Sequence, residues 1–176
     1  MPELITPSEE LRGSFLEAVE ELRAEGLLRQ TRSAFAAEIR HWGALLGSRE
    51  GFARYLNWVR QQSQPAEADA PVPFTTLWWA EGATFLGRLT IRHRLDEELL
   101  HYGGHIGYMV RPTSRQRGHA TGMLRASLVR ARELGLGRVL VTCDEDNVPS
   151  RKVIEACGGV FEDQRQEKLR YWIETG

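Results

Sequence analysis

The residues best suited to chemistry lie in one basic, glycine-containing run, residues 111–120 (RPTSRQRGHA). The run follows an apolar stretch that ends at Val110 and precedes an amphipathic one. Backbone N–H groups at the start of a helix are unpaired and carry the positive end of the helix dipole, so they bind phosphate. Gly118 would let a ligand approach the backbone closely, and Arg115 and Arg117 add positive charge. The run predicts a phosphate site, and a solvated basic turn is the alternative.

Two common phosphate-binding motifs are absent from the sequence. A P-loop needs Gly, four residues and then Gly-Lys-Ser or Gly-Lys-Thr, and this order does not occur. The dinucleotide motif Gly-x-Gly-x-x-Gly does not follow any predicted strand. A phosphate ligand held without either motif indicates a different nucleotide-like cofactor.

Hydrophobic periodicity predicts the elements that would position this run. Helical spacing covers residues 11–22 and 52–59, whereas residues 35–46 fit either an extra helix or a structured loop. A loop is predicted for residues 61–73, which are rich in Gln, Ala, Asp and Pro. Alternating apolar residues then predict three strands, at 74–80, 84–95 and 104–110.

The second half of the chain is predicted to alternate between helices and strands. The predicted order is helix 120–134, strand 138–142, helix 150–157 and strands 160–162 and 169–173. A strand, a helix and a strand around the basic run predict a parallel pair formed by residues 106–110 and 139–142. The expected fold class is therefore α/β (α+β), with a mixed, mostly antiparallel sheet and flanking helices.

The chain is expected to form a single domain, residues 1–176. The N-terminal helices, at about 8–60, are too few to hold a separate hydrophobic core. The cofactor-binding core is expected at about 74–173.

The motifs resemble those of the GNAT acetyltransferase superfamily. Residues 115–120 match its pattern Gln/Arg-x-x-Gly-x-Gly/Ala. Its next block has an Asn, a small residue three positions later and a Gly about eleven positions later, which Asn147, Ser150 and Gly158 match. The resemblance covers about residues 74–173, fits the N-terminal helices loosely, and is strongest to a bacterial subgroup of predicted acetyltransferases. It implies a GNAT-like sheet in which the parallel strands splay apart.

The resemblance also implies an enzyme, an N-acetyltransferase with acetyl-CoA as donor and no metal ion. The pantetheine arm would lie between the splayed strands, and the pyrophosphate would bind the N–H groups of the basic run. The implied cofactor-binding residues are Tyr108, Met109, Val110, Arg115, Gln116, Arg117, Gly118, His119, Ala120, Thr121 and Asn147. A neutral amine, on a small molecule or a peptide, would attack the thioester, and the Val110 N–H is a candidate donor to the developing oxyanion.

One position departs from the superfamily and concerns the proton donor. Many members carry a Tyr seven residues after the Asn, but this chain has Ile154, which cannot donate a proton. Ser150, Cys143 and Tyr108 are the candidate substitutes, although Ser150 is better explained as a cap of the helix after Pro149. The departure keeps a second function open, a non-catalytic acyl-CoA-binding or interaction module on the same fold.

The base that takes the amine proton has two candidates. His105 lies early on a predicted central strand, and imidazole suits proton transfer near neutral pH. Asp144 follows the buried strand 138–142 and could face the same cleft. The alternatives are a packed histidine and a strand-end cap. His93, His101 and Asp96 lie in a connection that could border the acceptor, and they are interpreted as loop residues.

Composition limits the remaining partners and the compartment. The 176 residues carry a formal net charge of -1 and 27% charged residues, which does not indicate nucleic acid or a membrane surface as a partner. The N-terminus lacks a secretory signal pattern, and the two cysteines, Cys143 and Cys157, have no metal-ligand spacing. A cytoplasmic protein with free thiols is expected. Residues 170–173 could pack the sheet or form the edge of a homodimer.

Overall fold

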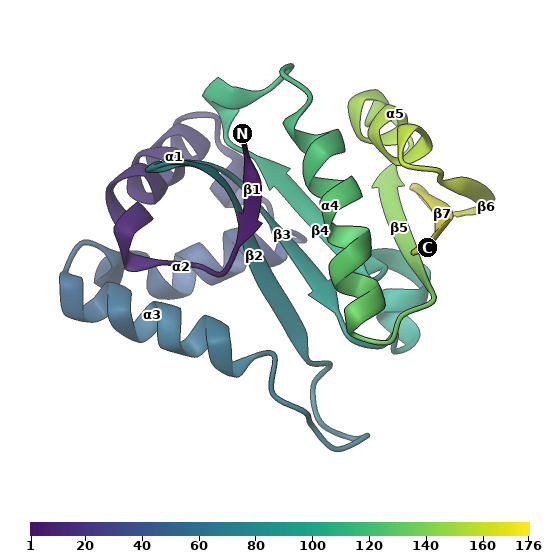
Figure 1. The fold of residues 1–176 in the computed structure, drawn as a ribbon, viewed down its shortest axis with the longest axis horizontal. Coiled ribbons are helices and arrows are strands. Elements are labelled where there is room, and N and C mark those ends of the chain that lie inside the picture. The colour runs from purple at the N-terminus through teal and green to yellow at the C-terminus, as the bar shows by residue number, and fades with distance from the viewer.

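The computed structural model describes all residues, Met1–Gly176, as one sheet with helices on both faces (Figure 1). The helices are α1 (Arg12–Ala24), α2 (Ala34–Leu46), α3 (Arg49–Gln61), α4 (His119–Glu133) and α5 (Val148–Ala156). The strands are β1 (Glu3–Ile5), β2 (Phe74–Glu81), β3 (Thr84–Arg92), β4 (Ile106–Val110), β5 (Arg138–Asp144), β6 (Val160–Arg165) and β7 (Lys168–Glu174).

The seven-stranded sheet has the order β1-β2-β3-β4-β5-β7-β6. Every neighbouring pair is antiparallel except β4 and β5, which are parallel. The α4 helix connects these two strands, as the strand, helix and strand order requires. The predicted mixed sheet with one parallel pair is therefore confirmed.

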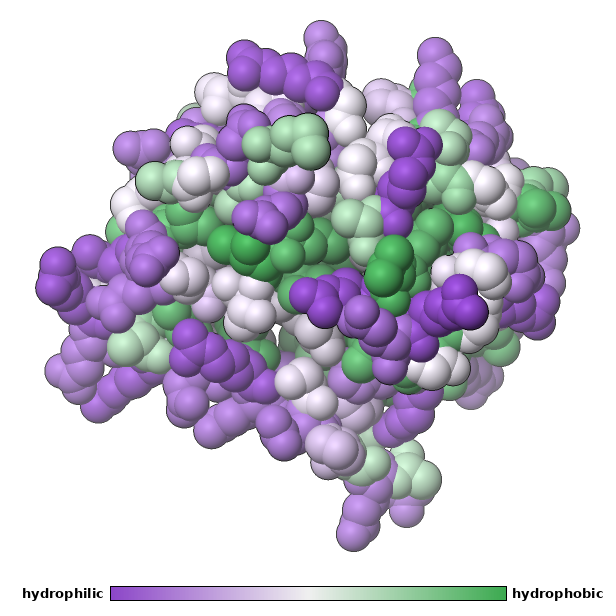
Figure 2. Space-filling model, in the orientation of Figure 1, coloured by the Kyte–Doolittle hydropathy of each residue, from purple (hydrophilic) through white to green (hydrophobic).

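Two hydrophobic cores lie on opposite faces of the sheet. Successive side chains of a strand point to opposite faces, and on β2 Leu77 and Trp79 join one core whereas Trp78 joins the other. The first core includes Met123 of α4, and the second includes Phe15 of α1. In Figure 2 hydrophobic residues gather in patches near the middle of the face shown, with hydrophilic residues around them.

Two elements, α2 and β1, go beyond what was predicted from the sequence. Residues 35–46, left open above, form α2, which begins where the Ser33 hydroxyl accepts a hydrogen bond from the Ala36 N–H. The β1 strand was not predicted, because three residues are too few for a periodic pattern; it pairs with β2 at one edge of the sheet. No helix is both long and apolar enough to span a bilayer.

Candidate functional site

The parallel strands β4 and β5 are joined only where the start of β4 meets the middle of β5. The His105 N–H donates to the Leu140 carbonyl at 2.7 Å, and the Leu140 N–H donates to Nδ1 of His105 at 2.9 Å. The single ladder pair is Ile106 with Val141. The two strands share no ladder pair beyond Ile106. A gap therefore separates β4 from β5 over the rest of β4, and it is called the gap below.

The open edge of β4 presents unpaired backbone groups to β5. Every second residue from His105 to Arg111 directs its backbone groups to β3. The His105 carbonyl accepts from the Arg92 N–H, and the Arg111 N–H donates to the Leu86 carbonyl. By the alternation of an antiparallel ladder, the backbone groups of Tyr108 and Val110 point the other way, towards β5, where the Val110 carbonyl accepts from Arg115 and the other three groups are unpaired. An extended ligand could therefore add to β4 as an extra strand.

The basic run forms a loop followed directly by the N-terminus of α4. The backbone is left-handed at Gln116 (φ 62°) and at Gly118 (φ 78°), which is the N-cap of the helix. The six N–H groups from Gln116 to Thr121 donate no hydrogen bond within the protein. Consecutive free donors at a helix N-terminus attract a multiply charged anion.

The two arginines of the loop differ in their surroundings. Arg115 forms an ion pair with Glu25 at the end of α1 (2.9 Å), and its Nε lies 3.4 Å from the Val110 carbonyl oxygen. Arg117 is exposed and has no ion pair. The available side-chain charge at the loop therefore comes from Arg117, because Glu25 already balances Arg115.

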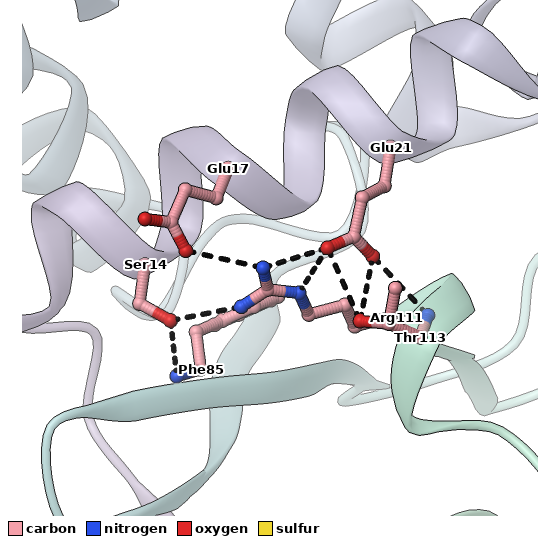
Figure 3. Close-up of polar contacts among 6 residues, drawn as sticks. All are labelled: Ser14, Glu17, Glu21, Phe85, Arg111 and Thr113. Atoms are coloured by element: carbon pink, nitrogen blue, oxygen red, sulfur yellow. Dashed lines mark hydrogen bonds and ion pairs between the residues drawn. The ribbon is translucent and has the colours of Figure 1, made fainter.

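A polar network fastens the loop to α1 (Figure 3). Arg111 donates to Glu21 at 2.7 Å and to Ser14 at 3.1 Å, and its Nη2 pairs with Glu17 at 3.1 Å. The Thr113 N–H also donates to Glu21, at 3.2 Å. Partial burial acts to raise the pKa of Glu21, but the hydrogen bonds from Arg111 and Thr113 hold it below its ordinary value.

Replacing Glu21 with Gln should make this part of the fold less stable at neutral pH. We expect a loss of about 1 kcal/mol, the net value of a typical hydrogen-bonding interaction. Because the folded-state pKa of Glu21 is lowered, its stabilisation is present above the unfolded pKa of about 4.3 and is lost as the pH falls through the folded value. Denaturant unfolding from pH 7 to pH 3 measures the difference, with the exposed Glu20→Gln as the matched control. A pH-independent difference would contradict the expectation.

The start of α5 places the Ser150 hydroxyl against the Tyr108 hydroxyl of β4. The Asn147 Oδ1 accepts from the Ser150 N–H at 3.2 Å, so Asn147 caps the helix and the capping role predicted for Ser150 is wrong. The Ser150 hydroxyl instead lies 2.7 Å from the Tyr108 hydroxyl. Burial raises the pKa of Tyr108 to about 12, against the opposing effect of the Ser150 hydrogen bond. Tyr108 is therefore protonated at neutral pH.

Ile154 and Cys143 are buried and do not line the cavity. Ile154 has no exposed surface and packs in the core below α5, and Cys143 is 4% exposed on β5. Burial raises the pKa of the Cys143 thiol. Ile154 therefore presents no side chain to a ligand in the cavity.

Ile154→Tyr should destabilise the protein without creating a proton donor. The larger ring must enter a filled core, where overpacking costs about 1–3 kcal/mol. Denaturant unfolding measures the loss, and Ile154→Val is the control for a smaller apolar change at the same position. Unchanged stability with faster turnover would show that the ring reaches the gap instead.

His105 and Asp144, the two candidate bases, occupy different places. His105 is 6% exposed, its Nδ1 accepts the Leu140 N–H, and it does not line the cavity described below. Burial, with the positive charge of Arg92, lowers the pKa of His105 to about 4. Asp144 lines the cavity and forms an ion pair with Lys168 at 2.6 Å. The position of His105 fits the packed histidine named above as the alternative.

The three residues interpreted as loop residues, His93, His101 and Asp96, do not line the cavity either, and His101 lies in the short π-helix Leu99–Gly103 rather than in a loop. His93 contacts Thr75 at 2.8 Å, His101 contacts Arg165 at 2.7 Å, and the Asp96 carboxylate accepts the Leu99 N–H at 2.8 Å.

One cavity of about 1320 Å³ joins the loop, the gap and the face of the sheet below α2. Its first part is lined by the loop and α4 N-terminus, by Tyr108, and by Asn147 and Ser150 of α5. Its second part, called here the acceptor chamber, lies between the sheet and the helices α2 and α3. The residues that line the acceptor chamber are Phe35, Glu38, His41, Trp42, Trp58, Phe74, Arg88, Thr90, Arg92 and Gly107.

No residue of the acceptor chamber was among the site residues predicted from the sequence. A signal was present on β3, where Arg88, Thr90 and Arg92 alternate with apolar residues and therefore share one face of the strand. Two arginines on one face of a strand, where a core would need apolar residues, indicate a polar cavity. Nowhere in the chain do three or more His, Cys, Asp or Glu residues form a group that could hold a metal ion.

Comparisons with known proteins agree with this geometry. The family model described as acetyltransferase (GNAT) domain matches residues 16–160. The ribosomal L7/L12 alpha-N-protein acetyltransferase RimL, solved with coenzyme A, has a TM-score of 0.66 and 16% identity, covering 98% of this chain and 93% of that one. RimJ of Mycobacterium smegmatis, solved with CoA-disulfide, has a TM-score of 0.65 and 19% identity. The match covers 98% of this chain and 81% of that one.

A third similar structure is the microcin C7 self immunity acetyltransferase MccE, solved with acetyl-CoA and AMP. It has a TM-score of 0.64 and 11% identity, covering 98% of this chain and 92% of that one. At such identities these three likenesses show the fold alone, and no curated protein matches the sequence. The family model, however, spans well over half of the chain. The chain belongs to the GNAT acetyltransferase family.

Proposed function

We propose that the protein is an acetyl-CoA-dependent N-acetyltransferase that acetylates a primary amine. The observation that carries the proposal is the joining of three features in one cavity: free N–H groups on the loop, an open β4 edge and a separate acceptor chamber. The first two features fit a cofactor that has a pyrophosphate and an extended arm. The third gives a second substrate access to the end of that arm.

The residues present fit coenzyme A at specific places. The pyrophosphate would bind the N–H groups of Gln116 to Thr121, with Arg117 adding charge. The arm would pair with the backbone of Tyr108 and Val110, with Met109 between them on β4. The Asn147 side chain lines the cavity, and its amide nitrogen has no partner in the protein, so it can donate to the arm. When bound, the cofactor supplies an acetyl thioester.

The protein's own groups would assist the reaction in three ways. The gap-facing N–H of Val110, or that of Tyr108 deeper in the gap, donates to the oxygen that gains charge as the amine attacks. The Ser150 hydroxyl, paired with that of Tyr108, would hold a proton where the sulfur leaves as the C–N bond forms and the C–S bond breaks, and the proton released by the amine would replace it through water in the cavity. Asp144, or water held by it, accepts the proton that the amine loses. We do not assign this step to His105, because its Nδ1 is occupied and it lies outside the cavity.

Two assays test the proposed function. Calorimetry should show acetyl-CoA binding with micromolar affinity and much weaker binding of NAD, because the loop has neither nucleotide motif. Thiol release should then occur with at least one member of a panel of amines, together with the acetylated product by mass spectrometry. Tight acetyl-CoA binding without release by any amine would support the non-catalytic acyl-CoA-binding alternative.

A homodimer also stays a prediction, and the sheet indicates where it would form. Residues 170–173 lie on β7, which is interior to the sheet, so they cannot form its edge. The edge strand is β6, on which Val160 is 70% exposed and Phe161 is 53% exposed. A second copy would meet this edge, and light scattering of Phe161→Glu beside the wild type would test it.

A further inference from the structure

The acceptor chamber contains more positive than negative charge. Its walls carry two guanidinium groups, Arg88 and Arg92, and one carboxylate, Glu38. Arg88 is 5% exposed, pairs with Glu38 at 3.1 Å and donates to the Thr76 and Thr90 hydroxyls at 3.3 and 3.2 Å. Glu38 also accepts from the Tyr55 hydroxyl at 2.6 Å. Arg88 and Glu38 therefore balance each other, and the excess charge belongs to Arg92.

Arg92 has one side of its guanidinium engaged and the other side free. Its Nη1 donates to the carbonyls of Gly103 and Gly104, both at 3.1 Å. No carboxylate lies within ion-pair distance, and Nε and Nη2 have no hydrogen-bond partner in the protein. Burial, reinforced by the charge of Arg88, lowers the pKa of Arg92 from its ordinary value, and the carboxylates of Asp96 and Glu98, beyond ion-pair distance, oppose this shift only in part. A partly buried cation that no carboxylate contacts directly is costly unless a ligand supplies a counter-ion in contact with it.

The free edge of Arg92 lies close to the reacting end of the cavity. Its guanidinium packs over Gly107 of β4, where a Cβ would lie 3.8 Å from both Nη1 and Nη2. The next residue, Tyr108, begins the open edge of β4 and contacts Ser150. A group bound by Arg92 would therefore be near an amine placed at the gap. The hydrogen bonds that hold the Gly103 and Gly104 carbonyls use only Nη1 of Arg92. A purely structural role for Arg92 therefore leaves its Nε and Nη2 donors without a purpose.

Aromatic side chains from α2, α3 and β2 line another part of the acceptor chamber. Trp42 and Trp58 have ring centroids 5.8 Å apart, and Trp58 is 6.5 Å from Phe74. The Trp42 indole N–H is buried without a hydrogen-bond partner. These side chains suit an apolar part of the acceptor and offer one donor to a carbonyl or hydroxyl oxygen of the ligand.

We propose that the acceptor is a primary amine that also carries a carboxylate, which the Nε and Nη2 donors of Arg92 bind in a bidentate pair. The Nε–Nη2 edge of a guanidinium matches the two oxygens of a carboxylate, whereas a lysine ammonium does not. The carboxylate belongs either to a free amino acid or to an acidic side chain near the N-terminus of a peptide. This inference rests on the proposed function, whose amine acceptor it specifies.

Matched acids and amides test the inference in two arms. The first compares phenylalanine with phenylalaninamide, and the second compares the amidated dipeptides alanyl-aspartate and alanyl-asparagine. In each arm, binding to the protein saturated with CoA is measured by calorimetry, and kcat/KM with acetyl-CoA by thiol release. In at least one arm the acid should bind roughly ten- to a hundredfold more tightly than its neutral partner, as a charge-assisted pair requires. The arm that shows this preference identifies the source of the carboxylate.

Variants of Arg92 show whether this residue causes the preference. Arg92→Gln should remove the preference while leaving the amide unaffected, and Arg92→Lys should restore it only in part. Arg94→Gln is the matched control, because Arg94 lies outside the cavity and donates to the Ala68 and Ala70 carbonyls. The melting midpoint and the CoA affinity of each variant show whether the fold and the cofactor site are intact.

The outcomes separate this inference from the proposed function. Equal binding of acid and amide in both arms, absence of binding in both, or an equal effect of Arg92→Gln on acid and amide would overturn the inference. Selective binding of the acid without thiol release would retain the carboxylate site and overturn the acetyltransferase activity. Thiol release without any preference for the acid would retain the acetyltransferase activity and overturn the carboxylate site.

Discussion

Gly118→Asp should abolish measurable binding of acetyl-CoA at micromolar concentration. The glycine is the N-cap of α4, and a Cβ built on it meets no atom within 4 Å. The added carboxylate would stand beside the free N–H groups of the loop, where the pyrophosphate is proposed to bind. Opposing like charges cost several kcal/mol, which corresponds to about a hundredfold or greater loss of affinity. Calorimetry with acetyl-CoA measures the loss.

Gly135→Asp is the matched control for this change. Gly135 follows the C-terminal end of α4, has φ 85° compared with 78° at Gly118, and also has no atom within 4 Å of a built Cβ. The backbone strain introduced by a side chain is therefore similar at the two positions. We expect similar melting midpoints for both variants and a loss of acetyl-CoA binding only for Gly118→Asp. Normal binding by Gly118→Asp would mean that the glycine is only a requirement of the turn.

Ser150→Ala should lower kcat by roughly ten- to a thousandfold, with little change in the affinity for acetyl-CoA. The Ser150 hydroxyl is 2.7 Å from the Tyr108 hydroxyl, and both residues line the cavity. No other pair of hydroxyls in hydrogen-bonding contact lies at the gap. Asn147 rather than Ser150 caps α5, so removing the hydroxyl should leave the helix intact. Steady-state kinetics at saturating amine, together with the melting midpoint, separates the two effects.

Tyr108→Phe and the double variant complete the test of this hydroxyl pair. If the two hydroxyls act as one unit, the double variant should lose no more activity than the worse single variant. Ser150→Thr, which keeps a hydroxyl, should recover part of the activity. Tyr171→Phe is the control, because that hydroxyl contacts Glu155 outside the cavity. Unchanged kcat in Ser150→Ala, or a loss explained entirely by lower stability, would contradict the role in proton donation.

The fold could largely be predicted from the sequence because its elements have strong local signals. The amphipathic spacing of residues 120–134 and the buried strand 138–142 correspond to α4 and β5. Their order around the basic run is enough to predict the parallel pair. The α2 helix could not be decided, because nothing local to residues 35–46 shows that its buried face packs against the sheet. That packing depends on residues of α3 and β2, which are distant in sequence.

The candidate site could be predicted only where a backbone motif defines it. The loop around Gly118 has a sequence pattern, so the free N–H groups could be expected before the structure. The contact between Tyr108 and Ser150 could not, because it depends on how α5 is placed across the gap. For the same reason Ser150 was predicted as a helix cap, although Asn147 holds that position. The acceptor chamber joins α2, α3 and β3, and no local pattern links these segments.

A crystal structure of the protein with CoA would test the central claim most directly, because the claim concerns where the cofactor binds. We predict pyrophosphate oxygens within hydrogen-bonding distance of the N–H groups of Gln116 to Thr121. We also predict the pantetheine arm between β4 and β5, paired with Tyr108 and Val110, with its sulfur near the Ser150 hydroxyl. CoA bound elsewhere, or an arm that leaves the β4 edge unpaired, would contradict the account.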